Sequence, residues 1–294
     1  MFVNNFVIRK SYIVNRISYI VNRKSYMSSS PLALYDDLPL WSAPFGLTLL
    51  DTIRMRQGIN VLDIGSGSGF PMFELAERLG KSCMVYGLDP SDESVAMITA
   101  KKDARDIVNA RIIRGVAEEI PFPDEYFGLI VSNNGLNNVA DQAASFKECY
   151  RVADKGTQMV LTMNLPHTMV EFYEVFEEIL SNLDLTIEIE KMYAHIDEKR
   201  KPVEFLKTLI EGSGFTIRSI NVDGFKLRYL DGTAFINHFL IRNGFMESWK
   251  SILPQNRTEE IFTLLEQKLN AIAGEKGELS MSVPFACFDC RKEK

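Results

Sequence analysis

The residues with the clearest chemical potential form a glycine-rich segment, Val61–Phe70, with the sequence VLDIGSGSGF. An apolar run typical of a buried strand leads directly into Gly65, Gly67 and Gly69. Because glycine has no Cβ, such a turn lets a cofactor approach the backbone and its N–H groups. A dinucleotide fingerprint has the spacing G-x-G-x-x-G, and its third glycine would fall at Phe70. The segment therefore predicts a cofactor-binding loop with the different spacing G-x-G-x-G.

A second chemical signal is Asp89, which lies 20 residues beyond Gly69 at the end of the next apolar run. A carboxylate at this place can accept hydrogen bonds from both hydroxyls of a ribose, a fit that neutral side chains do not match. The alternative is that Asp89 caps a helix that begins after Pro90 and Ser91. We expect Asp89 to bind the ribose of a cofactor.

The segment from Asp63 to Gly69 closely resembles the cofactor loop of class I S-adenosylmethionine-dependent methyltransferases, with its acidic residue two places before the first glycine. The resemblance continues in GVAEEIPF from Gly115, DEYFGLIVS from Asp124 and ECYRVADKG from Glu148, and it covers about residues 35–165. It implies S-adenosylmethionine as the cofactor and a place for Ala117 and Glu118 beside the adenine. The expected cofactor site then contains Asp63, Gly65, Ser66, Gly67, Gly69, Asp89, Pro90, Ala117, Glu118, Asn133 and Tyr35.

The sequence indicates the methyl acceptor less directly than the cofactor. The segment NGLNNVAD, from Asn134, is similar to the one after the fourth strand in ubiquinone and menaquinone biosynthesis methyltransferases, which implies C-methylation of a quinone ring. Two segments depart from that family: MNLP at 163–166 replaces its Glu-Phe-Ser-like signature, and LPLW at 38–41 lacks its His and Trp pattern. The Asn-Pro-Pro-aromatic motif of amino-group methyltransferases is absent at Ser132. We expect O- or C-methylation of a small quinone-like or lipid-like molecule.

Methyl transfer from a sulfonium depends mainly on positioning, and a general base is needed only if the acceptor must lose a proton. The candidate bases are His167, His195 and His238, although a histidine is more often a structural hydrogen-bonding residue. Asn133 and Asn134 are polar groups that could face the methyl group. These residues leave the catalytic group unidentified.

The elements that must position these residues follow from the pattern of apolar positions. Between residues 58 and 164, short apolar runs alternate with amphipathic stretches, as in βαβ units around a parallel sheet. The predicted strands are 60–64, 84–88, 111–114, 128–132 and 157–163, and the predicted helices are 70–80, 91–107 and 141–153. We expect an α/β fold with a Rossmann-like, seven-stranded, mostly parallel sheet and helices on both faces.

The flanking segments complete this prediction. Residues 36–56 suit a helix that covers the sheet edge, and Tyr35 before it either closes over the cofactor or joins the core. Beyond residue 165 we expect helices at 168–183, 202–212 and 258–273 and strands at 215–222, 225–230 and 279–289. The aromatic-rich segment 231–257 is either a lid over a pocket or an ordinary packed insert. Its aromatic residues and their neighbours line an apolar pocket or form core: Phe225, Tyr229, Phe235, Phe239, Phe245 and Trp249.

The chain divides into three predicted parts: 1–30, 31–165 as the cofactor-binding core, and 166–294, which completes the sheet and carries a helical lid at about 231–275. The first part contains one heptad three times (VIRKSYI, VNRISYI, VNRKSYM), with five basic residues and no acidic one. This period is too short for a solenoid and lacks a coiled-coil pattern. We expect a disordered, dispensable extension rather than a targeting segment, and Met27 as the true start.

Composition restricts the function further. The net charge of −6 disfavours nucleic acid as a partner, and no run of roughly 20 apolar residues predicts membrane insertion. Four scattered cysteines indicate a reducing cytoplasm rather than a disulfide framework. Cys287 and Cys290 form a C-x-x-C, but the second pair of a zinc site is missing, so we expect no metal. A homodimer is compatible with these features.

Two rival functions remain at this point. A nicotinamide-dependent oxidoreductase would use a similar sheet, although the glycine spacing disfavours NAD. A non-catalytic protein could retain the fold and the cofactor, although intact Gly65, Gly67, Gly69 and Asp89 favour a working site. The cofactor that the protein binds would distinguish these alternatives.

Overall fold

The computed structural model describes residues 40–293. The heptad repeat, the extension 1–30, the start at Met27 and the placement of Tyr35 lie outside the described residues.

The centre of the molecule is a seven-stranded sheet with the strand order β3-β2-β1-β4-β5-β7-β6. The strands β1 to β5 are parallel neighbours, and β7 is antiparallel to both β5 and β6. Their bounds are β1 Asn60–Ile64, β2 Met84–Asp89, β3 Ala110–Arg114, β4 Phe127–Asn133, β5 Ala153–Asn164, β6 Thr216–Tyr229 and β7 Leu279–Arg291. The predicted seven-stranded, mostly parallel sheet is confirmed, because only β7 runs against the others.

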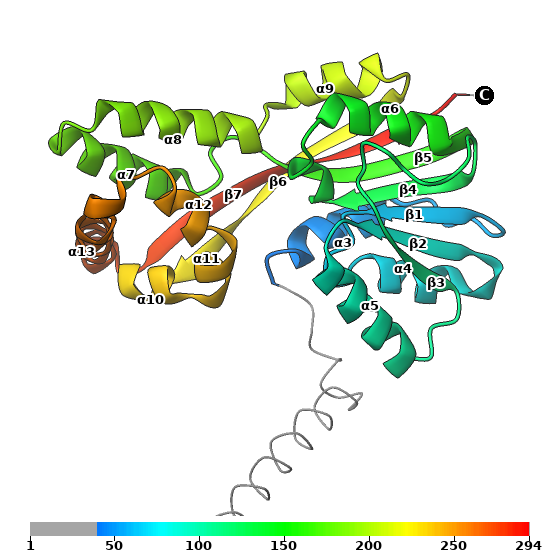
Figure 1. The fold of residues 1–294 in the computed structure, drawn as a ribbon, viewed down its shortest axis with the longest axis horizontal. Coiled ribbons are helices and arrows are strands. Elements are labelled where there is room, and N and C mark those ends of the chain that lie inside the picture. Colours follow the sequence, from blue (N-terminus) through cyan, green and yellow to red (C-terminus); the bar gives the residue numbers. More distant parts are fainter. Residues whose placement is uncertain (1–39, 294) are drawn as a thin grey trace, which may run out of the picture.

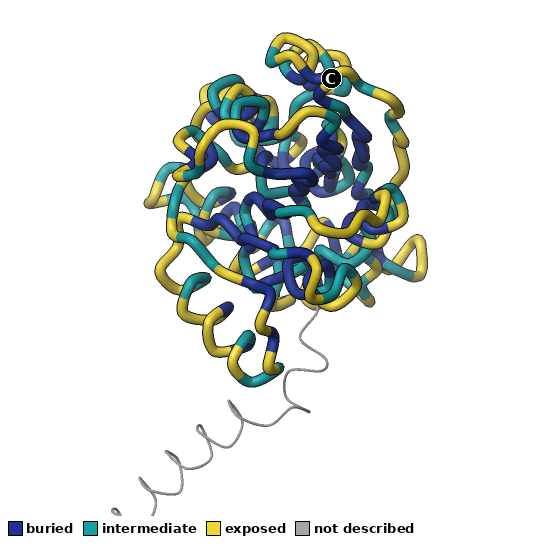
Figure 2. The backbone as a smooth tube through the Cα atoms, turned by 90° about the vertical axis from the view of Figure 1, so that its right-hand side faces the viewer, coloured by how far each residue is buried: buried dark blue, intermediate teal, exposed yellow. Residues whose placement is uncertain are grey.

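Helices cover both faces of this sheet. Their bounds are α3 Ala43–Thr52, α4 Met72–Leu79, α5 Asp92–Ala104, α6 Gln142–Val152, α7 Val170–Asn182, α8 Thr186–Lys199, α9 Val203–Gly212, α10 Gly232–Asn237, α11 Phe239–Gly244, α12 Met246–Lys250 and α13 Thr258–Lys276. One apolar core joins the sheet to α6 and α9, and another joins it to α3, α4 and α5. Strands covered on both faces need apolar side chains at successive positions, as in β1 and β4. Figure 2 shows the buried residues gathered in the middle of the molecule.

The N-terminal helix α3 differs in position from the prediction. It was expected over the sheet edge, but it contacts β4, β5 and β7 in the interior of the sheet. Phe45 explains this placement, since its buried ring packs edge-on against Phe285 of β7 at 4.9 Å between ring centroids. The carbonyl of Thr52 then accepts a hydrogen bond from the Gln158 side chain on β5, at 3.1 Å.

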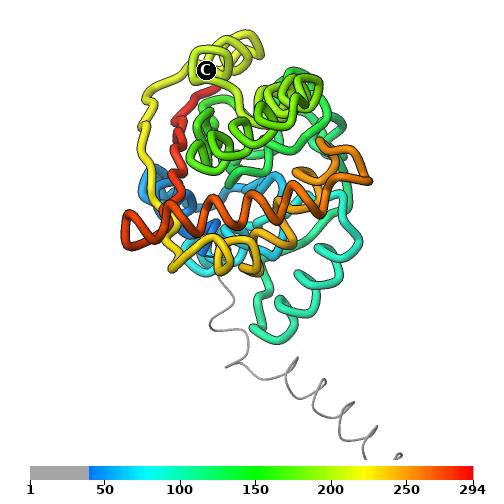
Figure 3. Tube along the Cα trace, turned by 90° about the vertical axis from the view of Figure 1, so that its left-hand side faces the viewer, coloured from blue at the N-terminus to red at the C-terminus, as the bar shows by residue number. Residues whose placement is uncertain are grey.

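The strands β6 and β7 run side by side (Figure 3) and extend beyond the sheet as a long ribbon (Figure 1). They pair from Thr216 with Arg291 to Tyr229 with Leu279, whereas β5 pairs with β7 only from Phe285 onward. The free half of the ribbon carries a second lobe with its own buried core, built from α7, α8 and α10 to α13 (Figure 1). The predicted helical insert before the last strand is therefore confirmed.

Two predictions about this part were wrong. The strands expected at 215–222 and 225–230 are the single strand β6, because Gly224 continues the ladder opposite Pro284 instead of making a turn. Helix α8 was not predicted. Of its side chains only Glu188 and Met192 are buried, so it lacks the apolar stripe by which an amphipathic helix is recognised.

The C-x-x-C pair lies within β7, as the predicted terminal strand requires, and all four cysteines are buried and free. Burial raises the pKa of the Cys287 thiol to about 11 and shifts that of Cys290 in the same direction. In residues 40–293 we find no helix long and apolar enough to cross a bilayer.

Candidate functional site

The glycine loop follows β1 and turns against β2. The N–H groups of Gly65 and Ser66 both donate to the carbonyl of Leu88, at 2.8 and 3.3 Å. Gly65 has a φ of +72°, and a Cβ there would lie 2.6 Å from Cα of Gly135 in the loop after β4. Only glycine satisfies both the left-handed backbone and this close approach. The loop thus leaves its backbone bare at the carboxyl end of the parallel strands.

Asp89 stands at the end of β2, beside this loop. Its Oδ2 accepts a hydrogen bond from the Gly67 N–H at 2.8 Å, and its Oδ1 accepts one from the Ser91 N–H at 3.0 Å. The alternative role as a helix cap is wrong, because the Ser91 hydroxyl caps α5 by accepting from Ser94 N–H. Each carboxylate oxygen has two acceptor positions, so one remains free on each. Asp89 can therefore bind two further hydroxyl groups.

A pocket of about 650 Å³ opens where these loops meet, and we call it the glycine-loop pocket. It is lined by Ile64, Gly65, Gly67, Leu88, Asp89, Pro90, Gly115, Val116, Ala117, Glu118, Gly135, Asn138, Val139 and Ala140. Six of the predicted cofactor residues are in this set, from three different loops. Gly115 and Asn138 lie in segments that resemble the methyltransferase family, but neither residue was predicted to belong to the site. Gly115 directly follows the predicted strand 111–114, and Asn138 lies in the loop after the predicted strand 128–132, which was the available signal.

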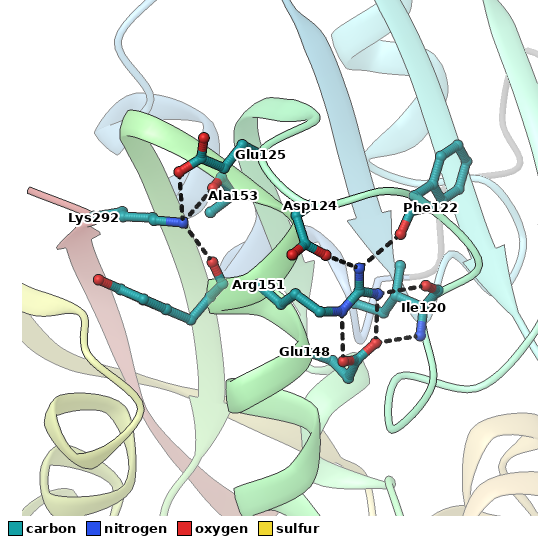
Figure 4. A network of polar contacts seen from close by, with 9 residues as sticks. Ile120, Phe122, Asp124, Glu125, Glu148, Arg151, Ala153 and Lys292 are labelled. Atoms are coloured by element: carbon teal, nitrogen blue, oxygen red, sulfur yellow. Dashed lines mark hydrogen bonds and ion pairs between the residues drawn. The ribbon is translucent and has the colours of Figure 1, made fainter. Parts of the chain in front are cut away.

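A polar network holds the loop that carries Ala117 and Glu118 (Figure 4). The Arg151 guanidinium of α6 donates to the carbonyls of Ile120 and Phe122, both at 2.8 Å, and pairs with Glu148 at 2.7 Å and Asp124 at 2.8 Å. Glu148 in turn accepts from the Ile120 N–H at 2.9 Å. Hydrogen bonding to Arg151 holds the pKa of Glu148 below its usual value. The loop after β3 is thereby fixed to α6.

Glu118 links two walls of the pocket. Its Oε1 accepts hydrogen bonds from the N–H groups of Ala140 and Asp141, at 2.7 and 3.0 Å. The loops after β3 and β4 therefore meet at one carboxylate. With Asp89, it gives the pocket an acidic lining that suits a cationic ligand.

Asp63 lies beneath the loop and is completely buried. Neither of its carboxylate oxygens accepts a hydrogen bond from the residues that the structure describes. Burial raises its pKa to about 7, while the nearby Ser66 hydroxyl and Met72 N–H act in the opposite direction. Ser66 is also buried and donates its hydroxyl to the Asp63 carbonyl at 3.0 Å. These two residues support the loop from below and do not line the pocket.

Asn133 and Asn134, the polar residues predicted to face the methyl group, make hydrogen bonds outside the glycine-loop pocket. The Asn133 amide donates to the carbonyl of Ser42 at 3.2 Å and accepts from the Thr162 hydroxyl at 2.9 Å. Asn134, with a φ of +61°, accepts from the Asn137 amide at 3.1 Å. They fix the exit of β4, and neither is a lining residue of the glycine-loop pocket.

The three histidines lie outside the lining of the glycine-loop pocket. His167 is exposed, and His238 caps α11 by accepting from the Leu240 N–H at 3.3 Å. His195 is half-buried in α8, where burial, then Arg200 and Lys199, lower its pKa. None of the three lines the glycine-loop pocket.

The aromatic residues after β6 divide into core and surface. Phe235 and Trp249 are buried in the second lobe, whereas Phe239 is exposed. Phe225, Tyr229 and Phe245 are partly buried against these cores. Phe235 and Trp249 are therefore core residues and do not line a pocket.

The parallel sheet with one reversed strand and a glycine loop after β1 defines a Rossmann-like methyltransferase fold. Residues 62–161 match the family model described as a methyltransferase domain, which confirms the predicted resemblance.

Curated relatives of this chain are also methyltransferases. The demethylmenaquinone methyltransferase of Geobacillus sp. (strain WCH70) is 33% identical over 124 residues, 42% of this chain and 53% of the relative. That of Listeria welshimeri is 36% identical over 107 residues, 36% and 45% of the two chains. The chain thus spans about half the length of these relatives.

Solved structures share the fold. The YcgJ protein from Bacillus subtilis is 18% identical with a TM-score of 0.57, over 86% of this chain and 99% of that one. Phosphoethanolamine N-methyltransferase 2 from Haemonchus contortus, solved with phosphomonomethylethanolamine and S-adenosylhomocysteine, is 20% identical with a TM-score of 0.52, over 85% and 52%. At these identities the likeness is one of fold.

Proposed function

We propose that this protein binds S-adenosylmethionine in the glycine-loop pocket and transfers its methyl group to oxygen or carbon of a small quinone-like or lipid-like acceptor. The observation that carries the proposal is the pocket itself, which joins the bare loop of Gly65 and Gly67 to the half-free carboxylate of Asp89. It lies within the segment that matches the methyltransferase domain. The match supports methyl transfer over hydride transfer to NAD.

The residues present fit this cofactor. Asp89 would hold the two ribose hydroxyls with its free acceptor positions, and Ala117 and Glu118 would flank the adenine. The loop at Gly65 would hold the methionine end, where a side chain would collide with Gly135. S-adenosylmethionine supplies an electrophilic methyl group on a cationic sulfur, and the acidic lining complements that charge.

The contribution of the chain to the reaction is positioning of the cofactor and the acceptor. The acceptor oxygen or carbon gains the methyl carbon as the carbon–sulfur bond breaks, and the acceptor loses a proton. Fixed loops at both ends of the pocket provide the alignment that such a displacement needs. The proton of the acceptor passes to water, because none of the three histidines lines the glycine-loop pocket.

The remaining assignments belong to the same proposal. We assign residues 31–165 to cofactor binding and residues 166–294 to completion of the sheet and a lid near 231–275. Four free, buried thiols support a reducing compartment, the cytoplasm. The net charge of −6 supports a small molecule over nucleic acid as the partner. The homodimer stays a prediction.

Calorimetric titration of the full chain with S-adenosylmethionine, S-adenosylhomocysteine and NAD tests the proposal. We expect micromolar binding of the first two and none of NAD. Binding of NAD alone would refute it, and no binding would support a non-catalytic protein. Transfer of labelled methyl groups to a naphthoquinol, compared with a long-chain alcohol, then tests the acceptor class.

A further inference from the structure

Lys101 of α5 is a buried lysine that contacts the glycine loop. The residue is 6% exposed, and its Nζ donates a hydrogen bond to the carbonyl of Ser68 at 2.9 Å. Lysine is rarely buried to this extent, because its ammonium group loses water that only strong polar contacts replace. A hydrogen bond from a charged donor is roughly twice as strong as a neutral one. The contact therefore fixes Ser68 to α5.

The peptide group that Lys101 holds lies in a permissive part of the backbone. Ser68 stands between Gly67 and Gly69, whose φ angles are +52° and +100°. Glycine has more backbone conformations open to it than any other residue, so a peptide between two glycines can turn unless something binds it. The Ser68 carbonyl shares its peptide plane with the Gly69 N–H, which donates to the Ser66 carbonyl at 2.7 Å. Binding of the carbonyl by Lys101 therefore also keeps this turn of the loop in place.

The first half of the loop is anchored differently, by β2. Three successive N–H groups, from Gly65 to Gly67, donate to the Leu88 carbonyl and the Asp89 carboxylate. Within the described part of the chain, no hydrogen bond joins the second half of the loop to β2. The bond from Lys101 supplies the anchor on that side.

The position of Lys101 on α5 explains why it reaches the loop. A Cβ at Gly69 would lie 3.4 Å from Cγ1 of Ile98, which is completely buried. Lys101 follows Ile98 by three residues, so the two side chains lie on the same face of the helix. The next residue, Lys102, pairs instead with Asp103 at 3.5 Å. Lys102 is therefore a matched control for the contact that Lys101 makes.

Resting on the function proposed above, we infer that Lys101 is a positioning residue that holds the glycine loop ready for the methionine end of S-adenosylmethionine. Lys101 does not line the glycine-loop pocket, so it acts on the cofactor through the loop. A loop that is fixed before binding loses less conformational entropy when the ligand arrives. Ribose and adenine bind at Asp89 and at the loop after β3, which Lys101 does not hold. Its effect is therefore on the amino-acid part of the cofactor.

The test is calorimetry of the full chain with S-adenosylhomocysteine and with methylthioadenosine, which keeps the adenine and ribose but lacks the amino-acid end. In Lys101→Met we expect S-adenosylhomocysteine to bind about tenfold more weakly and methylthioadenosine to stay within about twofold of its wild-type affinity. Lys101→Arg keeps a charged donor and should recover most of the lost affinity. Lys102→Met should bind both ligands as the wild type does. If Lys101→Met does not fold, Lys101→Gln replaces it with the same expectations.

Two calorimetric results would overturn the inference. One is wild-type affinity of Lys101→Met for S-adenosylhomocysteine, and the other is an equal loss for both ligands, which would show a general effect on the fold. A wild-type protein that does not bind S-adenosylhomocysteine would instead refute the proposed function.

Hydrogen exchange of the ligand-free protein tests the anchor without any cofactor. The Gly69 N–H should exchange faster in Lys101→Met than in the wild type, because its peptide group is no longer held, and at the wild-type rate in Lys102→Met. Equal exchange in all three proteins would overturn the inference.

Discussion

Arg151 in the methyltransferase domain has a side chain that is 32% exposed, whereas Arg200 in the second lobe is buried, and the groups around the two arginines also differ. Arg151 makes hydrogen bonds to two carboxylates and two backbone carbonyls, and so fixes a loop of the cofactor pocket. Arg200 makes one hydrogen bond to a hydroxyl and has no counterion in the described part of the chain. The carboxylates that pair with Arg151 compensate its charge, whereas a hydroxyl and an aromatic face compensate only part of the charge of the buried Arg200.

Asp63 extends this comparison to an anion. Within residues 40–293, neither carboxylate oxygen of Asp63 accepts a hydrogen bond, and no acidic side chain forms an ion pair with Arg200. Burial of a charge that no counterion balances costs free energy, so each group lowers the stability of the fold when it is charged.

The largest expected effect is on the pH dependence of stability through Asp63. Its pKa rises from 3.8 in the unfolded chain to about 7 in the folded protein, so folding favours the protonated form. Protonation of Asp63 therefore stabilises the folded protein fully below pH 3.8. Between pH 3.8 and 7 this stabilisation declines by about 1.4 kcal/mol per pH unit, and above pH 7 it is lost, roughly 4 kcal/mol in all. Denaturant unfolding of the wild type and Asp63→Asn from pH 4 to 8 should show this difference in slope. Parallel curves would contradict it, and exposed Asp154→Asn is the control.

Removing the satisfied arginine should cost nearly as much. Arg151→Met leaves Glu148 half-buried without its partner and frees two carbonyls, so we expect the free energy of unfolding to fall by about 3 kcal/mol. The affinity for S-adenosylmethionine should fall about tenfold, since Ala117 and Glu118 lose their support. Chemical denaturation and calorimetry measure the two effects. A stable variant would show that the network does not hold the loop.

Asp89→Ala should act on binding more than on folding. Loss of charged hydrogen bonds to the ribose should weaken S-adenosylmethionine binding by about 1.5 to 3 kcal/mol. Calorimetry on a variant of unchanged fold is the measurement. Ser91→Ala is the control, because it removes the cap of α5 and should lower stability without a comparable loss of affinity. Equal affinity of Asp89→Ala and wild type would remove the ribose assignment.

The smallest expected effect concerns Glu118. In Glu118→Gln the amide oxygen can still accept from the N–H groups of Ala140 and Asp141, but the charge is lost. We expect cofactor affinity to fall by about 0.5 to 1 kcal/mol, as for one partly exposed charge–charge interaction. Calorimetry at two salt concentrations should show that the deficit shrinks as salt rises. A deficit independent of salt would mean that Glu118 acts through loop geometry alone.

Local pattern predicted much of the methyltransferase domain. The apolar run at 60–64, the loop from Gly65 and the acid at Asp89 identified β1, its turn and the end of β2, because their constraints act on neighbouring residues. Beyond residue 165, local pattern wrongly predicted a break at Gly224, which continues a strand. It also missed the helix at 186–199, which lacks a buried apolar stripe. Both depend on partners distant in sequence.

The sequence by itself determined the order of strands and helices, the bare glycine loop and the acidic residues that belong beside it, since backbone sterics and hydrophobic periodicity are local properties. Tertiary structure decided which of these groups are buried and paired. Lys199, Arg200 and Lys201 form a basic run that pattern alone would leave in solvent, yet the lobe buries the middle residue against Tyr173. Burial and pairing depend on what packs around a side chain, and only the folded chain brings α7, α8 and α12 together.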